Sequence, residues 1–102
     1  MEWVIKKSLK KKEHLNELYL EVKKEDFKDI CIYMSYKKQA ILRLMFATDE
    51  RAIDSRFRIY TVFSIPGSDR FYIIVLPLNE DEEGFPSITK QIPAAHWYER
   101  EI

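Results

Sequence analysis

The sequence is poor in residues on which several common classes of functional site depend. Its 102 residues include a single cysteine, Cys31, and only two glycines, Gly67 and Gly84. One thiol cannot form an internal disulfide, and an iron-sulfur cluster needs several cysteine ligands. Two isolated glycines cannot build the glycine-rich loop that cradles phosphate groups. The composition therefore excludes a protein that holds its own iron-sulfur cluster and one that binds nucleotides through a phosphate loop.

Long hydrophobic runs and an excess of one charge are also missing. No apolar stretch approaches the roughly 20 residues that a membrane-spanning helix needs, so we expect no direct membrane insertion. The 17 basic and 17 acidic residues cancel, so no overall field attracts nucleic acid or an anionic membrane. A lysine-rich chain with one cysteine and no signal-peptide pattern is expected in the cytoplasm.

Candidate metal ligands and catalytic groups are few and widely separated. Cys31, His14 and His96 have no ligand-pair spacing among them, so we expect no metal, no cofactor and no catalytic residues. We interpret His96 as a polar helix residue that bonds a backbone carbonyl or Glu99. The alternative is a titratable contact near a partner's active site.

Apolar side chains are abundant enough for one core. Hydrophobic residues make up 46% of the chain and aromatic residues 14%. A chain of this length is expected to form a single domain over residues 1–102.

Hydrophobic periodicity predicts one amphipathic helix. Phe27, Ile30, Cys31 and Met34 recur at the spacing of a helix that buries one face, and Asp26 is a suitable N-cap. Cys31 is expected to lie on the buried face as a small hydrophobic residue.

Three strands are predicted at 40–47, 57–65 and 71–78. The turn signal at 66–69 makes the last two an antiparallel hairpin. The third strand is apolar on both faces and is expected to be central in the sheet. Charged residues 49–56 are interpreted as an exposed loop between the first two strands.

Two N-terminal stretches and one acidic run have competing interpretations. Residues 1–12 contain five lysines, which we interpret as a solvated helix face or frayed terminus rather than an anion-binding arm. The apolar side chains of residues 15–22 fit either helical spacing or strand alternation. Four consecutive acidic residues at 80–83 are interpreted as a solvated loop, because consecutive carboxylates rarely converge on one cation.

The C-terminal stretch is the most distinctive part of the chain. Pro93 can open a helix that runs from about Ala94 to the end, and four-residue spacing then places His96 and Arg100 on one face. Tryptophan, tyrosine and arginine are enriched at interface hot spots, so we predict a charged, aromatic helix that binds a neighbouring subunit. The expected partner-binding residues are Phe85, Pro86, His96, Trp97, Tyr98, Glu99, Arg100 and Glu101.

This stretch resembles a family signature. Pro86-Ser87-Ile88-Thr89, followed by Pro93-Ala94-Ala95 and Trp97-Tyr98-Glu99-Arg100-Glu101, is similar to the C-subunit family of respiratory complex I, the NADH:quinone oxidoreductase. The related domain of energy-converting NiFe hydrogenases resembles this stretch in the same way. The resemblance extends more weakly back to about Val22.

The chain departs from that family in two places. His96 stands where the family commonly has asparagine, and the chain ends at Ile102, where the family continues into an acidic-aromatic-glycine segment and a His-Pro stretch. The chain is expected to be either a short member or a fragment cut within the motif. Its shortness favours the hydrogenase branch.

The resemblance implies a non-catalytic structural subunit or domain of a membrane-associated oxidoreductase complex. Such a domain carries no cofactor and docks to the large subunit, which holds the quinone site or the NiFe centre, beside iron-sulfur subunits. It lies on the cytoplasmic side, peripheral to the membrane through the complex. The resemblance also favours a strand ending near Val22.

The expected fold is α+β, with a mostly antiparallel sheet of three to four strands and helices packed on one face. An alternative function is a stand-alone binding module with an aromatic sheet face and a lysine-rich helix. Tyr60, Phe63, Phe71 and Tyr72 would then stack on single-stranded nucleic acid. The zero net charge and the missing glycine-aromatic motif of RNA-binding sheets oppose that alternative, so we expect no nucleic acid partner.

Overall fold

The computed structural model describes residues 2–54 and 56–79, together with residues 92, 95 and 99. These residues form an α+β fold, as predicted. In chain order the elements are α1 (Glu2–Lys7), β1 (Lys10–His14), β2 (Glu17–Glu21), α2 (Lys24–Tyr36), β3 (Ile41–Glu50), α3 (Arg51–Asp54), β4 (Arg56–Ser64) and β5 (Phe71–Asn79).

The strands form one sheet in the order β1-β2-β5-β4-β3. Every neighbouring pair is antiparallel except β2 and β5, which are parallel. The mostly antiparallel sheet and the central position of the last strand are therefore confirmed. The expected count of three to four strands was too low, because the described residues contain five.

The hairpin of β4 and β5 is also confirmed. Its register runs from Ser64 opposite Phe71 to Arg56 opposite Asn79. In the connecting turn the backbone N–H of Ser68 donates to the carbonyl of Ile65 at 3.0 Å. Gly67 has a φ of 86°, which a type II turn requires at its third position and which glycine adopts without a steric penalty.

Helix α2 buries the predicted face but starts earlier than predicted. Phe27, Ile30, Cys31 and Met34 are all 0% exposed. The helix begins at Lys24 after an extended Lys23, and no side chain caps it, so the prediction of Asp26 as N-cap was wrong. Asp26 lies in the first turn, where a carboxylate interacts favourably with the helix dipole.

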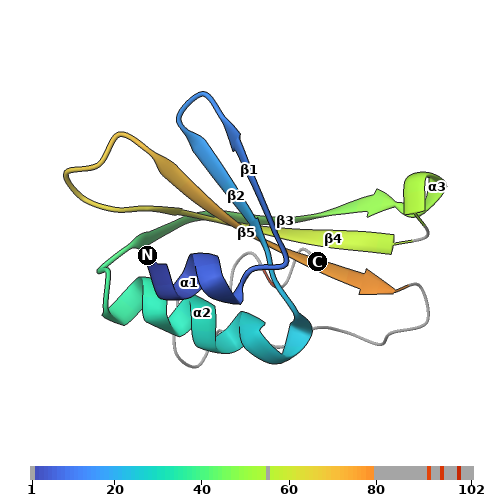
Figure 1. Ribbon diagram of the computed structural model, residues 1–102, viewed down its shortest axis with the longest axis horizontal. Coiled ribbons are helices and arrows are strands. Elements are labelled where there is room, and N and C mark those ends of the chain that lie inside the picture. The colour runs from blue at the N-terminus through green and yellow to red at the C-terminus, as the bar shows by residue number, and fades with distance from the viewer. Residues whose placement is uncertain (1, 55, 80–91, 93–94, 96–98, 100–102) are drawn as a thin grey trace.

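Helices α1 and α2 lie on the same side of the sheet (Figure 1), which confirms the prediction of helices on one face. The rings of Trp3 and Tyr33 join the two helices with centroids 4.9 Å apart. Val4 is the fully buried residue of α1.

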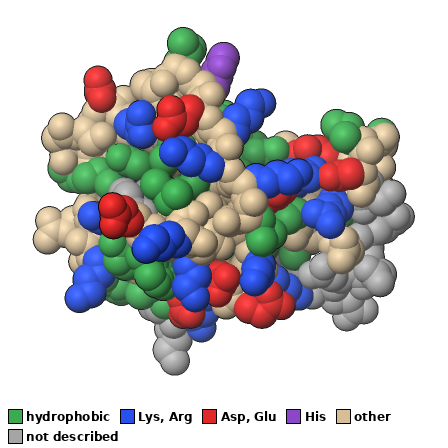
Figure 2. Space-filling model, viewed as in Figure 1, with side chains coloured by type: hydrophobic (Ala, Val, Ile, Leu, Met, Phe, Trp, Pro, Cys, Tyr) green, Lys and Arg blue, Asp and Glu red, His purple; other side chains and the backbone are tan. Residues whose placement is uncertain are grey.

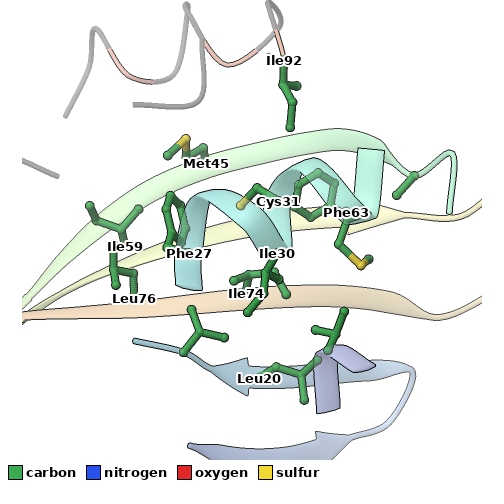
Figure 3. Close-up of a cluster of buried hydrophobic side chains, with 14 of the residues drawn as sticks. Leu20, Phe27, Ile30, Cys31, Met45, Ile59, Phe63, Ile74, Leu76 and Ile92 are labelled. Carbon is green, nitrogen blue, oxygen red and sulfur yellow. The ribbon is translucent and has the colours of Figure 1, made fainter. Parts of the chain in front are cut away.

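The core fills the space between the helices and the sheet (Figure 3). Side chains from α2, such as Phe27, meet Ile59 of β4 and Ile74 of β5 there. Ile92 and Ala95 belong to the same buried cluster. The C-terminal part of the chain therefore contributes to the core on the helix side.

Two predictions about charged segments need correction. Lys10, Lys11 and Lys12 are not on a helix or a frayed end but on β1, an edge strand whose five residues are all exposed. The loop expected at 49–56 contains the end of β3 and the short helix α3. Neither segment has the apolar pattern that predicts a regular element. The elements form because the main chain pairs with neighbouring strands and charged side chains form ion pairs.

The ambiguity at residues 15–22 is resolved in favour of a strand. Strand β2 buries Leu18 and Leu20 and leaves the residues on either side of them half-buried. Alternation, and not helical spacing, was the correct reading, as the resemblance favoured.

Candidate functional site

The sheet face opposite the helices is the candidate functional surface. On β4, Ile59 and Phe63 point into the helix-side core, so Arg58 and Tyr60 point to the other face. On β5, Ile73 and Val75 are only 3% and 6% exposed although they do not belong to the helix-side core. In the described part of the chain, no helix covers this face (Figure 1).

An open groove of about 580 Å³ crosses this face. It is built from side chains that alternate strand positions direct to one side of the sheet. Its lining comes from all five strands: Lys10, Lys12 and His14 of β1, Tyr19 and Glu21 of β2, Val75 of β5, Arg58 and Tyr60 of β4, and Phe46 and Thr48 of β3.

Arg58 is the centre of an ion cluster at one end of the groove. Its Nη1 lies 3.1 Å from Glu50 Oε1, its Nη2 lies 2.5 Å from Asp54 Oδ2, and its Nε lies 3.5 Å from Glu21 Oε1. The side chain is 12% exposed. A guanidinium can make such contacts in several directions at once, because its five N–H donors form a planar fork. We name this group the Arg58 cluster: Arg58, Glu21, Glu50 and Asp54.

Two hydroxyl groups also donate hydrogen bonds to the Glu50 carboxylate. The Tyr60 hydroxyl donates to Glu50 Oε2 at 2.8 Å, and the Thr48 hydroxyl donates to the same oxygen. Phe46 stacks on the Tyr60 ring, with centroids 5.1 Å apart and ring planes 11° from parallel. The ion cluster and the aromatic floor of the groove are therefore directly connected.

The Arg58 cluster changes the pKa of its members. The hydrogen bond to Asp54, together with the charges of the three carboxylates, raises the pKa of Arg58 against the opposing effect of burial. The hydrogen bond from Arg58 lowers the pKa of Asp54. Burial alone would raise the pKa of Glu50, but its hydrogen bonds and the Arg58 charge lower it overall. Burial and the nearby Glu50 raise the pKa of Tyr60. The lowered pKa values keep Glu50 and Asp54 ionised beside the Arg58 guanidinium at neutral pH.

Acidic and basic side chains are intermixed over the face seen in Figure 2. They lie against one another at the α3 end of the sheet. This distribution agrees with the zero net charge of the chain.

The predicted partner-binding helix falls mostly outside the described residues. Phe85, Pro86, His96, Trp97, Tyr98, Arg100 and Glu101 are not among them. The backbone is helical at Ala95 and at Glu99, which agrees with a helix in this stretch, and Glu99 is half-buried. Whether these residues bind a partner stays a prediction.

Cys31 lies on the buried side of α2 and is a free thiol (Figure 3). Burial raises its pKa, and the charge of Glu99 adds to this effect. A protonated, buried thiol is unreactive, so Cys31 packs as a small hydrophobic residue, as predicted.

The described part of the chain contains neither a metal-binding cluster nor a membrane-spanning helix. No group of three or more histidine, cysteine, aspartate or glutamate side chains there could hold a metal ion. No helix among those residues is long and apolar enough to cross a bilayer.

The alternative of an aromatic stacking surface meets a geometric difficulty. Phe63 is 0% exposed in the helix-side core and Tyr72 packs against that core. Of the four aromatic residues considered, only Tyr60 and Phe71 are directed to the groove side. The lysines at 10–12 lie on a strand and not on the helix that this alternative assumed.

The Arg58 cluster and the β1 lysines were not identified as a site from the sequence. Their members come from positions 10 to 58, and their proximity depends on strand order. The only local signal was the four-residue spacing of Asp54 and Arg58, which on a helix would suggest an ion pair.

Comparison with known proteins identifies the relatives of this chain. Residues 20–102 match the family described as "Respiratory-chain NADH dehydrogenase, 30 Kd subunit". Hydrogenase-4 component G of Escherichia coli K12 is 36% identical over 75 residues, which cover 72% of this chain and 14% of that protein. Formate hydrogenlyase subunit 5 of the same organism is 28% identical over 88 residues, which cover 85% of this chain and 16% of that protein.

A solved structure has the same fold. The trypsin-resistant fragment (1-134) of Nqo5 matches with a TM-score of 0.75 and 20% sequence identity, covering 87% of this chain and 74% of that fragment. The chain spans about a seventh of the length of its two curated relatives. Because the family match covers most of the chain and includes its C-terminal stretch, the chain belongs to the family of the 30 kDa subunit of the respiratory-chain NADH dehydrogenase.

Proposed function

We propose that the chain is a non-catalytic structural subunit or domain of a membrane-associated oxidoreductase complex, of the energy-converting hydrogenase or NADH:quinone oxidoreductase type. The observation that carries this proposal is the family match over residues 20–102. The names of the curated relatives, a component of hydrogenase-4 and a subunit of formate hydrogenlyase, support a role within an assembly and favour the hydrogenase branch.

In this proposal the chain is one domain that docks to the large subunit through its C-terminal stretch. The buried Ile92 and Ala95 fix two points of that stretch on the helix side of the sheet. Glu99 lies near enough to Cys31 for its charge to affect the thiol pKa, which places it on the same side. Aromatic and arginine side chains beside these points would supply the interface hot spots.

The proposed partners are the large subunit and the iron-sulfur subunits of the complex. Electrons would pass through cofactors in those neighbours, while this chain holds them in position. The chain would lie on the cytoplasmic side and reach the membrane only through the complex.

The test is affinity purification of the tagged chain from its native cells, followed by mass spectrometry of the proteins that accompany it. We expect a NiFe or quinone-reducing large subunit together with iron-sulfur subunits, and a loss of at least about tenfold in recovery with Arg100→Ala. Arg70→Ala is the matched control, because Arg70 lies in the turn after β4 and its guanidinium is 3.6 Å from Glu13. Recovery of a folded chain without oxidoreductase subunits would contradict the proposal.

A further inference from the structure

The turn between β1 and β2 has a leucine where the backbone favours glycine or asparagine. Leu15 and Asn16 form this two-residue connection, with His14 opposite Glu17 at its base. The φ of Leu15 is 55°, and tight hairpin turns require a positive φ at the first of their two central residues. The left-handed region is unfavourable for a bulky side chain, so the backbone is strained at Leu15.

The Leu15 side chain is not buried in compensation, because it is 89% exposed. An exposed aliphatic residue is not unusual by itself, and Ile53 of α3 is 80% exposed. Ile53, however, has no positive φ, whereas Leu15 combines exposure with strain. Neither backbone preference nor packing explains a leucine at this position, and conflicts of this kind are typical of functional positions.

The turn is held in place by a second loop. Asn16 Nδ2 donates to the carbonyl of Asp69 at 3.1 Å, and the backbone N–H of Phe71 donates to the carbonyl of Asn16 at 2.8 Å. In Figure 1 the tip of the β1–β2 hairpin projects from the sheet. The leucine is therefore presented on a fixed support, which reduces the conformational entropy lost when it binds a partner.

We propose that Leu15 is an anchor residue that inserts into an apolar pocket of a neighbouring protein subunit of the same assembly. This contact would act in addition to the C-terminal stretch. The choice of a subunit from the same assembly rests on the proposed function. The β1–β2 turn precedes the family match at residues 20–102, so the match itself does not include this contact.

The chemistry of the turn favours a protein pocket over a membrane. A single myristoyl chain gives only marginal binding to a bilayer, and a leucine side chain has far fewer carbon atoms. Both residues of the turn are uncharged, so the turn itself adds no attraction to anionic lipids.

A nucleic acid is also a poor partner for this turn. Bases stack on aromatic rings and on guanidinium groups, and an aliphatic side chain offers neither surface.

A second copy of the chain would have to receive Leu15 in one of its own hollows. The groove and a second hollow of about 520 Å³ at the β4–β5 turn both have charged walls, with Lys10, Lys12 and Arg58 in the groove and Arg43, Asp69 and Arg70 in the second hollow. A leucine inserted there would remove water from these charges and replace none of the lost hydrogen bonds. An apolar pocket on a different protein involves no such loss.

The first test is photo-crosslinking in cells that produce the full assembly, with an aliphatic diazirine amino acid in place of Leu15. We expect an adduct with one subunit of the oxidoreductase complex, on a peptide rich in apolar residues. The matched control has the same amino acid in place of Ile53, which is also aliphatic and exposed but lies on α3 at the other end of the sheet. No adduct with that peptide is expected from the control.

The variant Leu15→Asn separates binding from folding. Asparagine is polar and tolerates the left-handed region, so the variant removes the anchor and relieves the strain. Recovery of the complex with the tagged chain should fall at least about tenfold, because burial of a leucine contributes that much to affinity. The melting temperature of the chain alone should rise by about 2–5 °C.

Two further variants serve as controls. Leu15→Met keeps an apolar side chain and should retain recovery of the complex. Gln39 has a φ of 53°, so Gln39→Gly relieves a similar strain elsewhere in the chain and should leave recovery unchanged.

The outcomes separate this inference from the proposed function. If the chain purifies with its complex but the probe at position 15 forms no adduct with any subunit, the anchor inference is wrong and the proposed function stands. Adducts with lipid, with RNA, with a second copy or with a protein outside the assembly also overturn the inference. Unchanged recovery with Leu15→Asn does so too. A lower melting temperature of that variant also contradicts it, because Leu15 would then stabilise the chain itself.

Discussion

Arg58 and Glu21 lie 3.5 Å apart, measured from Nε to Oε1, although they stand on strands that are not neighbours. Strand β5 runs between β4 and β2, and the two side chains meet across it. Each is 12% exposed. This contact connects the hairpin half of the sheet to its N-terminal half on the face without helices.

Removing Arg58 should destabilise the fold. Arg58→Met leaves Glu21 and Glu50 without their cation, and an uncompensated, partly buried charge costs about 2 kcal/mol, below the range for fully buried pairs because Glu50 is partly solvated. Urea denaturation followed by fluorescence gives the free energy of unfolding. Arg70→Ala, which removes an exposed pair, should cost no more than about 0.5 kcal/mol. Equal losses in the two variants would show that the Arg58 cluster is not a stabilising centre.

Glu50 should make stability fall in acid. Its pKa in the folded chain is lowered, so its contribution is complete above the ordinary pKa of a glutamate and is lost as the pH falls through the folded pKa. Glu50→Gln should therefore flatten the acid side of the plot of unfolding free energy against pH. Tyr60→Phe, which removes one hydrogen-bond donor to Glu50, should flatten it less. A Glu50→Gln curve parallel to that of the unsubstituted chain would argue against the lowered pKa.

Cys31 should be unreactive while the chain is folded. Its thiol is 0% exposed and its pKa is raised by burial, so the thiolate that attacks an alkylating reagent is scarce. Alkylation by iodoacetamide at mildly alkaline pH should be at least about 1,000-fold slower than in denaturant. Rapid alkylation of the folded chain would mean that α2 opens locally without global unfolding.

Gly67 should be sensitive to substitution through its backbone alone. Its φ is 86°, and a Cβ built there would meet no atom within 4 Å. Gly67→Ala should therefore cost about 1 kcal/mol from conformational strain, without a steric clash. Gly67→Asn should cost less, because asparagine tolerates the left-handed region better. Thermal unfolding of the two variants measures the difference, and an equal or greater loss for asparagine would contradict this explanation.

The sequence was informative where an element buries one face. The helical spacing of Phe27 and Ile30, the alternation of β4 and the apolar run of β5 each predicted an element that the structure contains. These patterns exist because burial of apolar side chains is a local requirement of each element. The turn at Gly67 was predictable for a similar reason, since a positive φ demands a particular residue.

Elements exposed on both faces carried no such signal. Strand β1 reads Lys-Lys-Lys-Glu-His and forms because its main chain pairs with β2. Its lysines also protect the sheet edge from pairing with another chain. No periodicity could have identified it, and this explains why the predicted strand count was too low.

The candidate groove could not be predicted, because it depends on strand order. Val75 lies opposite Tyr60 on one side and Glu21 on the other, and both pairings cross more than ten residues of sequence. The charged residues at 49–56 were interpreted as a loop, whereas Glu50 and Asp54 bind Arg58. The sequence alone does not distinguish a charged side chain exposed to solvent from one that forms an ion pair.

The parallel pairing of β2 with β5 has a consequence for the order of events during synthesis. Residues 17–21 find their partners only at residues 71–75, so β2 leaves the ribosome long before the strand that completes it. Leu18 and Leu20 of β2 are buried in the folded protein. While β3 and β4 are being synthesised, β2 and α2 are still without β5. Closing so large a loop is slow compared with forming the β4–β5 hairpin. Residues 17–21 therefore reach their final place only after β5 has emerged, and until then Leu18 and Leu20 are exposed to chaperones and proteases.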